Sequence, residues 1–233
     1  MSIFAIGDTH LSLQGDKGMD VFPGWENYIE RLAKGWKALV KDDDTVVLVG
    51  DISWALRFED AVEDFRFLDS LPGKKLVLKG NHDFWWQTKT KNDAFLKEHG
   101  FDSISILFNN AYKVGDFVIC GSRGWFFDAC DENDAKVLRR EAGRLQMSLD
   151  EGFRLTENRE NVIVFLHYPP LTSNQVCHEL VDVLQKEGVR RVYYAHLHGA
   201  SHKFAFNGNH EGIDYRLVSA DYLSFYPYPV EIF

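Results

Sequence analysis

Five apolar segments of the chain each end at a polar residue of a type that binds metal ions. The segments are residues 3–7, 46–50, 76–80, 162–166 and 192–195. Continuous apolar runs of this length predict strands buried on both faces, which occur mainly in the parallel sheets of α/β proteins. The residues that follow these runs are Asp8, Asp51, Asn81, His167 and His196. Because the carboxyl ends of parallel strands meet at one edge of a sheet, we expect these side chains to lie where open α/β folds bind ligands.

The segments between the first three strands have the spacing of amphipathic helices. Residues 25–40 carry an apolar side chain about every three or four positions, and residues 58–71 and 85–99 follow a similar pattern. This alternation predicts a β-α-β-α-β-α order through the first hundred residues, with parallel strands joined by right-handed crossovers.

The second half of the chain predicts a more mixed arrangement. Residues 105–108 and 112–114 flank Asn109, Asn110 and Ala111 and are expected to form a hairpin. A strand follows at residues 117–121, the longest helix at 131–153, and short strands near 203–206, 215–218 and 229–233. We therefore expect an α/β fold of two mixed sheets packed together and covered by helices. The chain has no internal repeat or Pro/Gly-rich linker, so residues 1–233 are predicted to form a single domain.

Composition narrows the classes of protein to which the chain can belong. It has 233 residues, of which 45% are hydrophobic and 26% charged, as in soluble globular proteins. The formal charge of −9 argues against broad contact with a nucleic-acid backbone, which requires clustered Lys and Arg. No apolar run is long enough to span a membrane, and the amino terminus enters a strand too soon for a secretory signal. Cys120, Cys130 and Cys177 form no CxxC pair and are expected to be reduced, in a cytoplasmic protein.

Seven polar residues at or just after the apolar runs are candidate metal ligands. They are Asp8, His10, Asp51, Asn81, His167, His196 and His198. Seven ligands are too many for one tetrahedral ion, but they suit two adjacent ions that share a carboxylate. Imidazole and carboxylate groups without a thiolate favour Mn, Fe, Zn or Co over Ca. The sequence thus predicts a centre with two divalent metal ions.

The order and spacing of these residues resemble a known family. Gly7–His10, Gly50–Asp51, Gly80–Asp83, His167 and His196–His198 are similar to the five blocks of the calcineurin-like metallophosphoesterase superfamily. The resemblance implies a four-layer α/β/β/α sandwich. It also implies hydrolysis of a phosphate mono- or diester by in-line attack of a hydroxide that bridges the two metal ions.

The resemblance also implies a role for each matching residue. The first metal ion would be held by Asp8, His10, Asp51 and His198. The second would be held by Asp51, Asn81, His167 and His196, so that Asp51 bridges the two ions. His82 would face the substrate and assist the leaving group, and Asp83 would orient His82.

The chain departs from the family pattern at two places. Ala195 stands where the last block usually begins with Gly, and Gly50–Asp51 continues as Ile52–Ala55. The second segment lacks the Asp-Arg pair of the Ser/Thr protein phosphatases and is similar to a bacterial branch of predicted phosphohydrolases. The expected substrate is therefore a phosphorylated small molecule.

Several residues have both a functional and a structural interpretation. Trp54, Trp85 and Trp86 follow ligand blocks and could line a substrate pocket or pack in the core. Arg123 follows a strand and could bind a substrate phosphate or form a surface salt bridge. Asp83 could instead cap a helix that starts at Phe84. The remaining histidines, for which structural roles are expected, are His99, His178, His202 and His210.

Three other functions remain compatible with parts of the pattern. The first is a catalytically silent binding scaffold on the same fold, although such a protein would be expected to lack some of the ligands or His82. The second is a nuclease, which would require a basic groove. The third is a metal-binding or redox protein without hydrolysis, which would not require the pair His82 and Asp83.

Overall fold

The computed structural model describes residues 1–15, 17–125 and 132–231, and two sheets form its centre. The first sheet has the strand order β11-β1-β2-β3-β4. Its strands are β1 (Ile3–Ile6), β2 (Thr45–Val49), β3 (Lys74–Leu78), β4 (Ile104–Ile106) and β11 (Tyr228–Glu231). Strands β1 to β4 are parallel to one another, and β11 pairs antiparallel with β1.

The second sheet has the order β5-β6-β7-β8-β10-β9. Its strands are β5 (Tyr112–Val114), β6 (Phe117–Ser122), β7 (Val162–Leu166), β8 (Arg191–Tyr194), β9 (Gly208–His210) and β10 (Ile213–Leu217). The four central strands are parallel, and the edge strands β5 and β9 are antiparallel to their neighbours. Both sheets are therefore mixed, as expected from the sequence.

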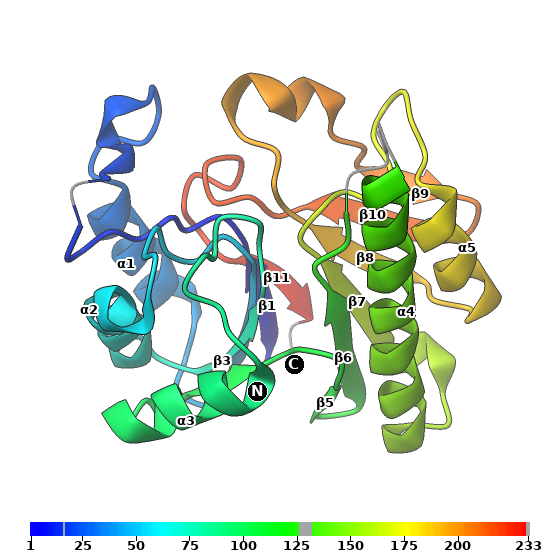
Figure 1. Ribbon diagram of the computed structural model, residues 1–233, viewed down its shortest axis with the longest axis horizontal. Coiled ribbons are helices and arrows are strands. Elements are labelled where there is room, and N and C mark those ends of the chain that lie inside the picture. The colour runs from blue at the N-terminus through cyan, green and yellow to red at the C-terminus, as the bar shows by residue number, and fades with distance from the viewer. Residues whose placement is uncertain (16, 126–131, 232–233) are drawn as a thin grey trace.

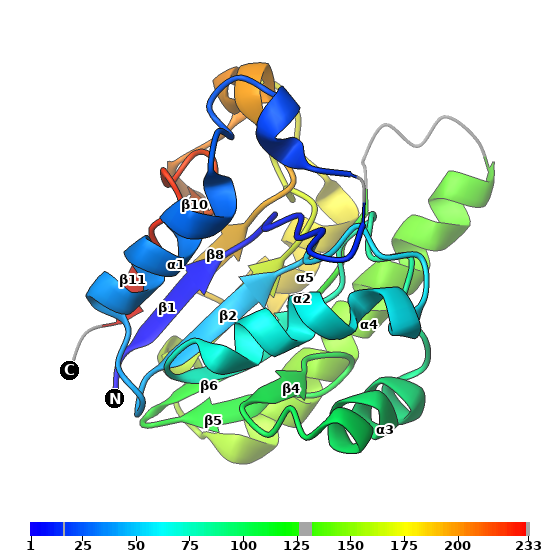
Figure 2. The same ribbon diagram turned by 90° about the vertical axis from the view of Figure 1, so that its left-hand side faces the viewer.

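Helices cover the outer face of each sheet. The first sheet is covered by α1 (Tyr28–Leu39), α2 (Phe58–Ser70) and α3 (Lys89–His99), which lie in front of it in Figure 2. The second is covered by α4 (Glu132–Leu155) and α5 (His178–Lys186), and the short 3-10 helices are η1 (Met19–Val21), η2 (Arg159–Asn161) and η3 (Gly199–Phe204). Figure 1 shows the resulting order of helices, sheet, sheet and helices. This arrangement confirms the predicted fold class.

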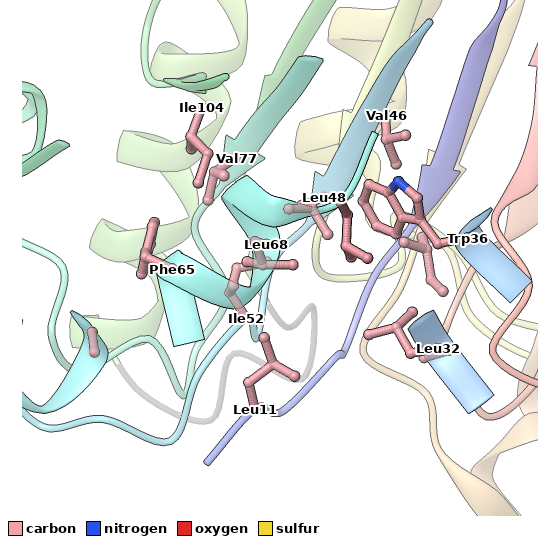
Figure 3. Packing of buried hydrophobic residues seen from close by; sticks show 14 of the residues in the cluster. Leu11, Leu32, Trp36, Val46, Leu48, Ile52, Phe65, Leu68, Val77 and Ile104 are labelled. Carbon is pink, nitrogen blue, oxygen red and sulfur yellow. The ribbon is translucent and has the colours of Figure 1, made fainter. Parts of the chain in front are cut away.

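Each strand buries both of its faces because the two faces contact different layers. In β2, Val46 and Leu48 pack against the helices of the first sheet, whereas Val47 and Val49 pack between the sheets. Figure 3 shows Trp36 of α1 and Leu68 of α2 beside the helix-facing side chains of β2. A fully buried side chain of this size contributes roughly 1.5–3 kcal/mol, which explains why the strands are apolar at consecutive positions. A third cluster fills the space between α4, α5 and the second sheet.

The predicted hairpin at residues 105–114 is wrong. Strand β4 pairs with β3 in the first sheet, whereas β5 pairs with β6 in the second. The chain crosses from one sheet to the other between them, because Leu107 is buried between the sheets and its N–H bonds to the carbonyl of Val77. The local hairpin forms instead between β5 and β6, where Gly115 has a positive φ of 58°.

Two other boundaries differ from the sequence prediction. The helix expected at residues 85–99 begins at Lys89, because Trp85 and Trp86 are buried in the preceding turn and Thr88 caps the helix. Residues 203 and 204 belong to the 3-10 helix η3 rather than to a strand. The long helix α4 begins at Glu132, so residue 131 of the prediction lies outside the described residues.

The described residues also bear on two further expectations, the absence of a membrane-spanning helix and the reduced state of the cysteines. None of its helices combines the length and the apolar character that crossing a membrane requires. Cys120 and Cys177 are buried and free, and Cys130 lies outside the described residues.

Candidate metal centre

The candidate ligands lie at the carboxyl ends of strands in both sheets. Asp8, Asp51 and Asn81 follow β1, β2 and β3, while His167 and His196 follow β7 and β8. Backbone hydrogen bonds join these strand ends within each sheet: the N–H of Asp8 donates to the Gly50 carbonyl, and that of Ala195 donates to the His167 carbonyl. The two sheets thus present their ligands to the same space.

Two groups of side chains are close enough to bind metal ions. One group is Asp8, His10, Asp51 and His198, and the other is Asp51, His167 and His196. Within each group, one ligand atom from every residue lies within 4.8 Å of the others. Asp51 belongs to both groups, so its carboxylate is located where a bridging ligand would be.

The Asp51 carboxylate is surrounded by nitrogen atoms. Its Oδ2 lies 2.9 Å from His82 Nδ1, 3.5 Å from His167 Nε2 and 3.7 Å from His10 Nε2. Its Oδ1 accepts a hydrogen bond of 2.7 Å from the backbone N–H of His82. One carboxylate oxygen is therefore tied to the backbone, and the other faces the imidazoles.

The arrangement of lone pairs fits bound cations. His167 Nδ1 donates to the Val49 carbonyl at 3.0 Å, so Nε2 is the ring nitrogen whose lone pair can bind a metal ion. That lone pair faces the Asn81 Oδ1 acceptor at 2.8 Å. Two acceptors at this distance repel each other unless a cation or a proton lies between them. The buried Asp8 Oδ1 likewise has no hydrogen-bond partner among the described residues.

Burial keeps two of the imidazoles neutral and ready to bind metal. It lowers the pKa of His10 to about 3 and that of His196 to about 2. Burial also opposes ionisation of Asp51, but His167 and the hydrogen bond from His82 hold its pKa below its ordinary value. The centre thus combines neutral nitrogen ligands with an ionised carboxylate at neutral pH.

The pKa values of Asp8 and the half-buried His198 are shifted in the opposite direction to those of Asp51 and His10. Burial raises the pKa of Asp8 from its ordinary value, and His198 and His167 partly offset this effect. Burial disfavours protonation of His198, but the Asp8 charge and the hydrogen bond to Asp221 raise its pKa to about 9. Binding of a metal ion at His198 would therefore displace a proton.

The backbone at the ligands is strained. Four candidate ligands have a positive φ: Asp8 at 57°, His10 at 43°, Asp51 at 50° and His196 at 75°. Non-glycine residues rarely adopt this region, and such residues concentrate at functional sites. At each of these residues the backbone leaves the extended conformation of the strand, and the side chain lies in the shared space.

Glycine is required where two of the ligand loops touch. A Cβ atom on Gly80 would lie 2.1 Å from both the backbone N and Oδ1 of Asp51. A Cβ atom on Gly50 would lie 2.6 Å from His167 Nδ1 and 2.8 Å from the backbone of Gly80. The glycines that precede Asp51 and Asn81 therefore permit the close approach of the loops after β2 and β3.

Asp83 binds the backbone of these same two loops. Its fully buried carboxylate accepts hydrogen bonds from the N–H groups of Gly80 at 2.7 Å, Ile52 at 2.8 Å and Asp51 at 3.0 Å. Trp85 Nε1 also donates to it, at 3.1 Å. The alternative helix-capping role is wrong, because Thr88 is the N-cap of α3. The Asp83 carboxylate thus joins the loops after β2 and β3, whereas the His82 ring contacts Asp51 at 2.9 Å.

Asp221 is a residue of the centre that the sequence analysis did not identify. Its Oδ1 lies 3.4 Å from His198 Nδ1 and 3.2 Å from His202 Nε2, and its Oδ2 accepts from the Gly199 N–H at 2.8 Å. This contact directs His198 Nε2 toward Asp8 and His10. Asp221 comes four residues after β10 (Ile213–Leu217), whose side chains alternate between buried and exposed, so no continuous apolar run marks it in the sequence.

Replacing Asp221 with Asn should weaken metal binding without unfolding the protein. Loss of a carboxylate that orients a metal-binding histidine typically costs about 10- to 100-fold in metal affinity. Calorimetric titration of metal-free protein with Mn²⁺ would measure this change. Activity should return at saturating metal, which a general structural defect would not allow.

Asp182→Asn is the matched control for this measurement. Asp182 also lies near a histidine, 3.9 Å from His178, but on the exposed surface of α5. We expect its metal affinity to equal that of wild type. Equal affinities of the Asp221→Asn and wild-type proteins would contradict the orienting role.

The three tryptophans and Arg123 occupy distinct environments. Trp85 is fully buried among the side chains of the first core, and Trp86 is nearly so. Trp54 stacks on the His10 ring at 4.7 Å and lies 4.6 Å from the His82 ring. Arg123 forms an ion pair of 3.2 Å with the buried Glu141 and also lines a pocket. Trp54 therefore borders the centre, Trp85 belongs to the core, and Arg123 lies outside both ligand groups.

Comparisons with known proteins agree with this geometry. The family model of calcineurin-like phosphoesterases matches residues 1–200. A search of curated proteins gave no match. Among solved structures, a phosphopantetheinyl hydrolase from Mycobacterium tuberculosis is 14% identical with a TM-score of 0.54, covering 94% of this chain and 88% of its own.

Two further structures share the fold. A protein of unknown function from Aquifex aeolicus is 18% identical with a TM-score of 0.50, covering 97% of this chain and 94% of its own. Protein TT1561 from Thermus thermophilus is 16% identical with a TM-score of 0.55, covering 84% of this chain and 81% of its own. At these identities the likeness shows the fold alone.

Proposed function

The chain belongs to the calcineurin-like phosphoesterase family, and we propose that it hydrolyses a phosphate mono- or diester with two divalent metal ions bound. The observation that carries this proposal is the position of Asp51, whose carboxylate belongs to two groups of candidate ligand atoms. A shared carboxylate between two ligand groups is typical of two-metal hydrolytic sites.

We propose that each of the two ligand groups binds one metal ion. We assign Asp8, His10, Asp51 and His198 to one ion, and Asp51, Asn81, His167 and His196 to the other. The oxygen and nitrogen donors suit Mn, Fe, Zn or Co. When bound, two such ions would supply positive charge for the phosphoryl oxygens and lower the pKa of a water molecule. The chain itself supplies the neutral imidazoles of His10 and His196 and the ionised carboxylate of Asp51 at fixed positions.

His82 is the group proposed to act on the substrate. Its side chain is 36% exposed, whereas that of Asp51 beside it is 1% exposed. The His82 ring is held between the Asp51 carboxylate and the Trp54 ring, so its free edge keeps a fixed direction. From this position a protonated His82 can donate a hydrogen bond to a phosphoryl oxygen or a proton to the leaving group.

The proposal is tested by hydrolysis of two simple esters. Wild-type protein reconstituted with Mn²⁺ should hydrolyse p-nitrophenyl phosphate, bis-p-nitrophenyl phosphate or both, and a chelator should remove the activity. His82→Gln should lower kcat by about 10²- to 10³-fold while two metal ions remain bound, because His82 is not one of the assigned ligands and the Gln amide can still donate a hydrogen bond to Asp51. Release of p-nitrophenol and metal analysis by mass spectrometry provide the two readouts.

His99→Gln is the control for the loss of an imidazole. The His99 ring packs between Phe95 and Phe101, in the layer of α3, and its replacement should leave kcat unchanged. Folded, metal-loaded wild type that cleaves neither ester would sink the proposal and favour a binding scaffold. Preference between the two esters would decide whether the enzyme is a monoesterase or a diesterase.

A further inference from the structure

We propose that the substrate carries a second phosphoryl group, and that a basic pocket beside the metal centre binds it. The pocket has a volume of about 520 Å³, and its walls include Lys79, Trp86, Phe108, Arg123, Arg140 and Arg144. This inference rests on the proposed phosphoesterase function and narrows its substrate class to small molecules with two separate phosphates.

The charge of the pocket is opposite to that of the protein. The chain as a whole has a formal charge of −9, yet five cationic side chains line this pocket, one of which, Lys89, pairs with Asp93 at 2.6 Å. The buried Glu141 is shared by two of them, at 3.2 Å from Arg123 Nη2 and 2.5 Å from Arg144 Nη1. Lys79 and Arg140 have no acidic partner within ion-pair distance among the described residues. The pocket therefore retains an excess of positive charge that an anion would neutralise.

Two buried donors in the pocket lack an acceptor. Trp86 Nε1 and Arg123 Nε are both buried, and neither has a hydrogen-bond partner in the described part of the chain. An indole N–H and a guanidinium N–H can only donate. Buried donors are normally hydrogen-bonded, so the Trp86 and Arg123 side chains keep unused donor capacity in the wall of the pocket.

The guanidinium groups are held in fixed orientations. Arg123 lies over the Trp125 ring at 4.6 Å, and Arg144 lies over the Phe108 ring at 5.1 Å. A planar guanidinium in a fixed orientation can donate two parallel hydrogen bonds. It therefore fits a phosphate, which offers two acceptor oxygens, better than it fits a ligand with a single acceptor atom. The pocket is thus suited to a tetrahedral, multiply charged oxyanion.

Two residues that line the pocket, Lys79 and Arg123, belong to or contact the loops that carry the metal ligands. Lys79 lies two residues before Asn81 on the same loop. The carbonyl of Arg123 accepts a hydrogen bond of 2.9 Å from the N–H of Tyr168, the residue after His167. A Cβ atom on Gly121 would lie 3.2 Å from Leu78 Cδ1, so β6 and β3 face each other across the sheets at this place. A substrate with one phosphate at the metal centre can therefore extend its other end toward the pocket.

The test compares substrates that differ only in the second phosphate. Mn²⁺-loaded protein is assayed with butyl phosphate and with the bisphosphates of 1,3-propanediol, 1,4-butanediol and 1,6-hexanediol, and the release of inorganic phosphate is measured. The best bisphosphate should exceed butyl phosphate in kcat/KM by about 10- to 100-fold, the effect of one or two charge-assisted hydrogen bonds. The optimal chain length reports the spacing between the two sites.

The variant that tests the pocket is Lys79→Met with Arg140→Gln. These two cations lack acidic partners among the described residues, so their removal leaves the Glu141 ion pairs intact. The matched control is Lys113→Met with Arg139→Gln, which removes the same charge from exposed positions outside the pocket. The pocket variant should lose the preference for bisphosphates and keep its activity on butyl phosphate, whereas the control should retain the preference.

Direct binding separates this inference from the proposed function. Metal-free protein is titrated with 1,4-butanediol bisphosphate by calorimetry, so that binding does not depend on turnover. Binding by wild type and the control, weakened at least tenfold in the pocket variant, supports the pocket even if no ester is hydrolysed. Equal kcat/KM for butyl phosphate and all bisphosphates, or equal binding by all three proteins, overturns the inference and leaves the phosphoesterase proposal standing.

Discussion

Replacement of Asp51 with Asn should reduce ester hydrolysis by at least about 10³-fold while the protein stays folded. The Asn side chain retains Oδ1, which can still accept the backbone N–H of His82. It replaces Oδ2, which faces His10, His82 and His167, with an uncharged donor. The shared negative charge between the two ligand groups is therefore lost without a change in volume.

Metal content distinguishes this result from unfolding. Wild type is expected to bind two Mn²⁺ ions per chain and Asp51→Asn at most one, as measured by mass spectrometry after dialysis. Asp116→Asn provides the control, because Asp116 lies in the exposed turn between β5 and β6. An Asp51→Asn protein with two bound ions and wild-type kcat would contradict the assignment of Asp51 as the shared ligand.

Replacement of Asp83 should instead destabilise the whole protein. Its carboxylate accepts from the backbone N–H groups of Gly80, Asp51 and Ile52 and, at 3.3 Å, from that of Ser53. In Asp83→Ala these buried donors lose their acceptor, at a cost of about 3–5 kcal/mol in the free energy of unfolding. Asp83→Asn should be nearly as harmful, because its amide NH₂ would face N–H groups. A loss of this size lowers the Tm by roughly 6–20 °C in a chain of this length.

Asp64→Asn is the matched control for a buried carboxyl group. Asp64 accepts from the Leu13 N–H at 2.8 Å and from the Ser53 hydroxyl, and burial raises the pKa of Asp64 above its ordinary value. Burial also raises the pKa of Asp83, to about 6, so the difference lies in the donors. The Ser53 hydroxyl beside Asp64 can turn to accept from an amide, whereas the backbone N–H groups around Asp83 can only donate, and the Asp64 site should therefore tolerate the amide better. Thermal and urea unfolding of both variants measures the difference. A Tm of Asp83→Asn within about 2 °C of wild type would contradict the role of Asp83 in joining the loops.

Much of the fold follows from the sequence because the strands contact a different layer on each face. Continuous runs such as residues 46–49 indicate burial on both sides, and the ligand that follows each run marks the strand end. The hairpin prediction failed because a local pattern around Asn109 indicates a turn but does not say which sheet each flanking strand joins. Whether the strands pair with each other or join different sheets depends on Leu107, which packs between the two sheets against residues that are distant in the sequence.

The candidate site was predictable to a similar extent. Its ligands follow strands, so their convergence could be expected from the parallel order. The hydrogen bonds of Asp83 could not be predicted from the sequence, because its partners are backbone N–H groups, which every residue except proline carries. The basic pocket was also hidden, since Lys79 and Arg140 belong to different layers of the fold and only the packing of those layers brings them together.

The distribution of the candidate ligands over the two sheets has a consequence for the lifetime of the protein. Asp8, Asp51 and Asn81 follow strands of the first sheet, and His167 and His196 follow strands of the second. Ions held by both sets would cross-link the sheets, and ligands that bind only the folded state add about 2.7 kcal/mol of stability at a concentration of about 100 Kd. Metal-starved cells would then contain a chain that opens more often and is degraded sooner. The supply of metal would thus set the abundance of this protein as well as its activity.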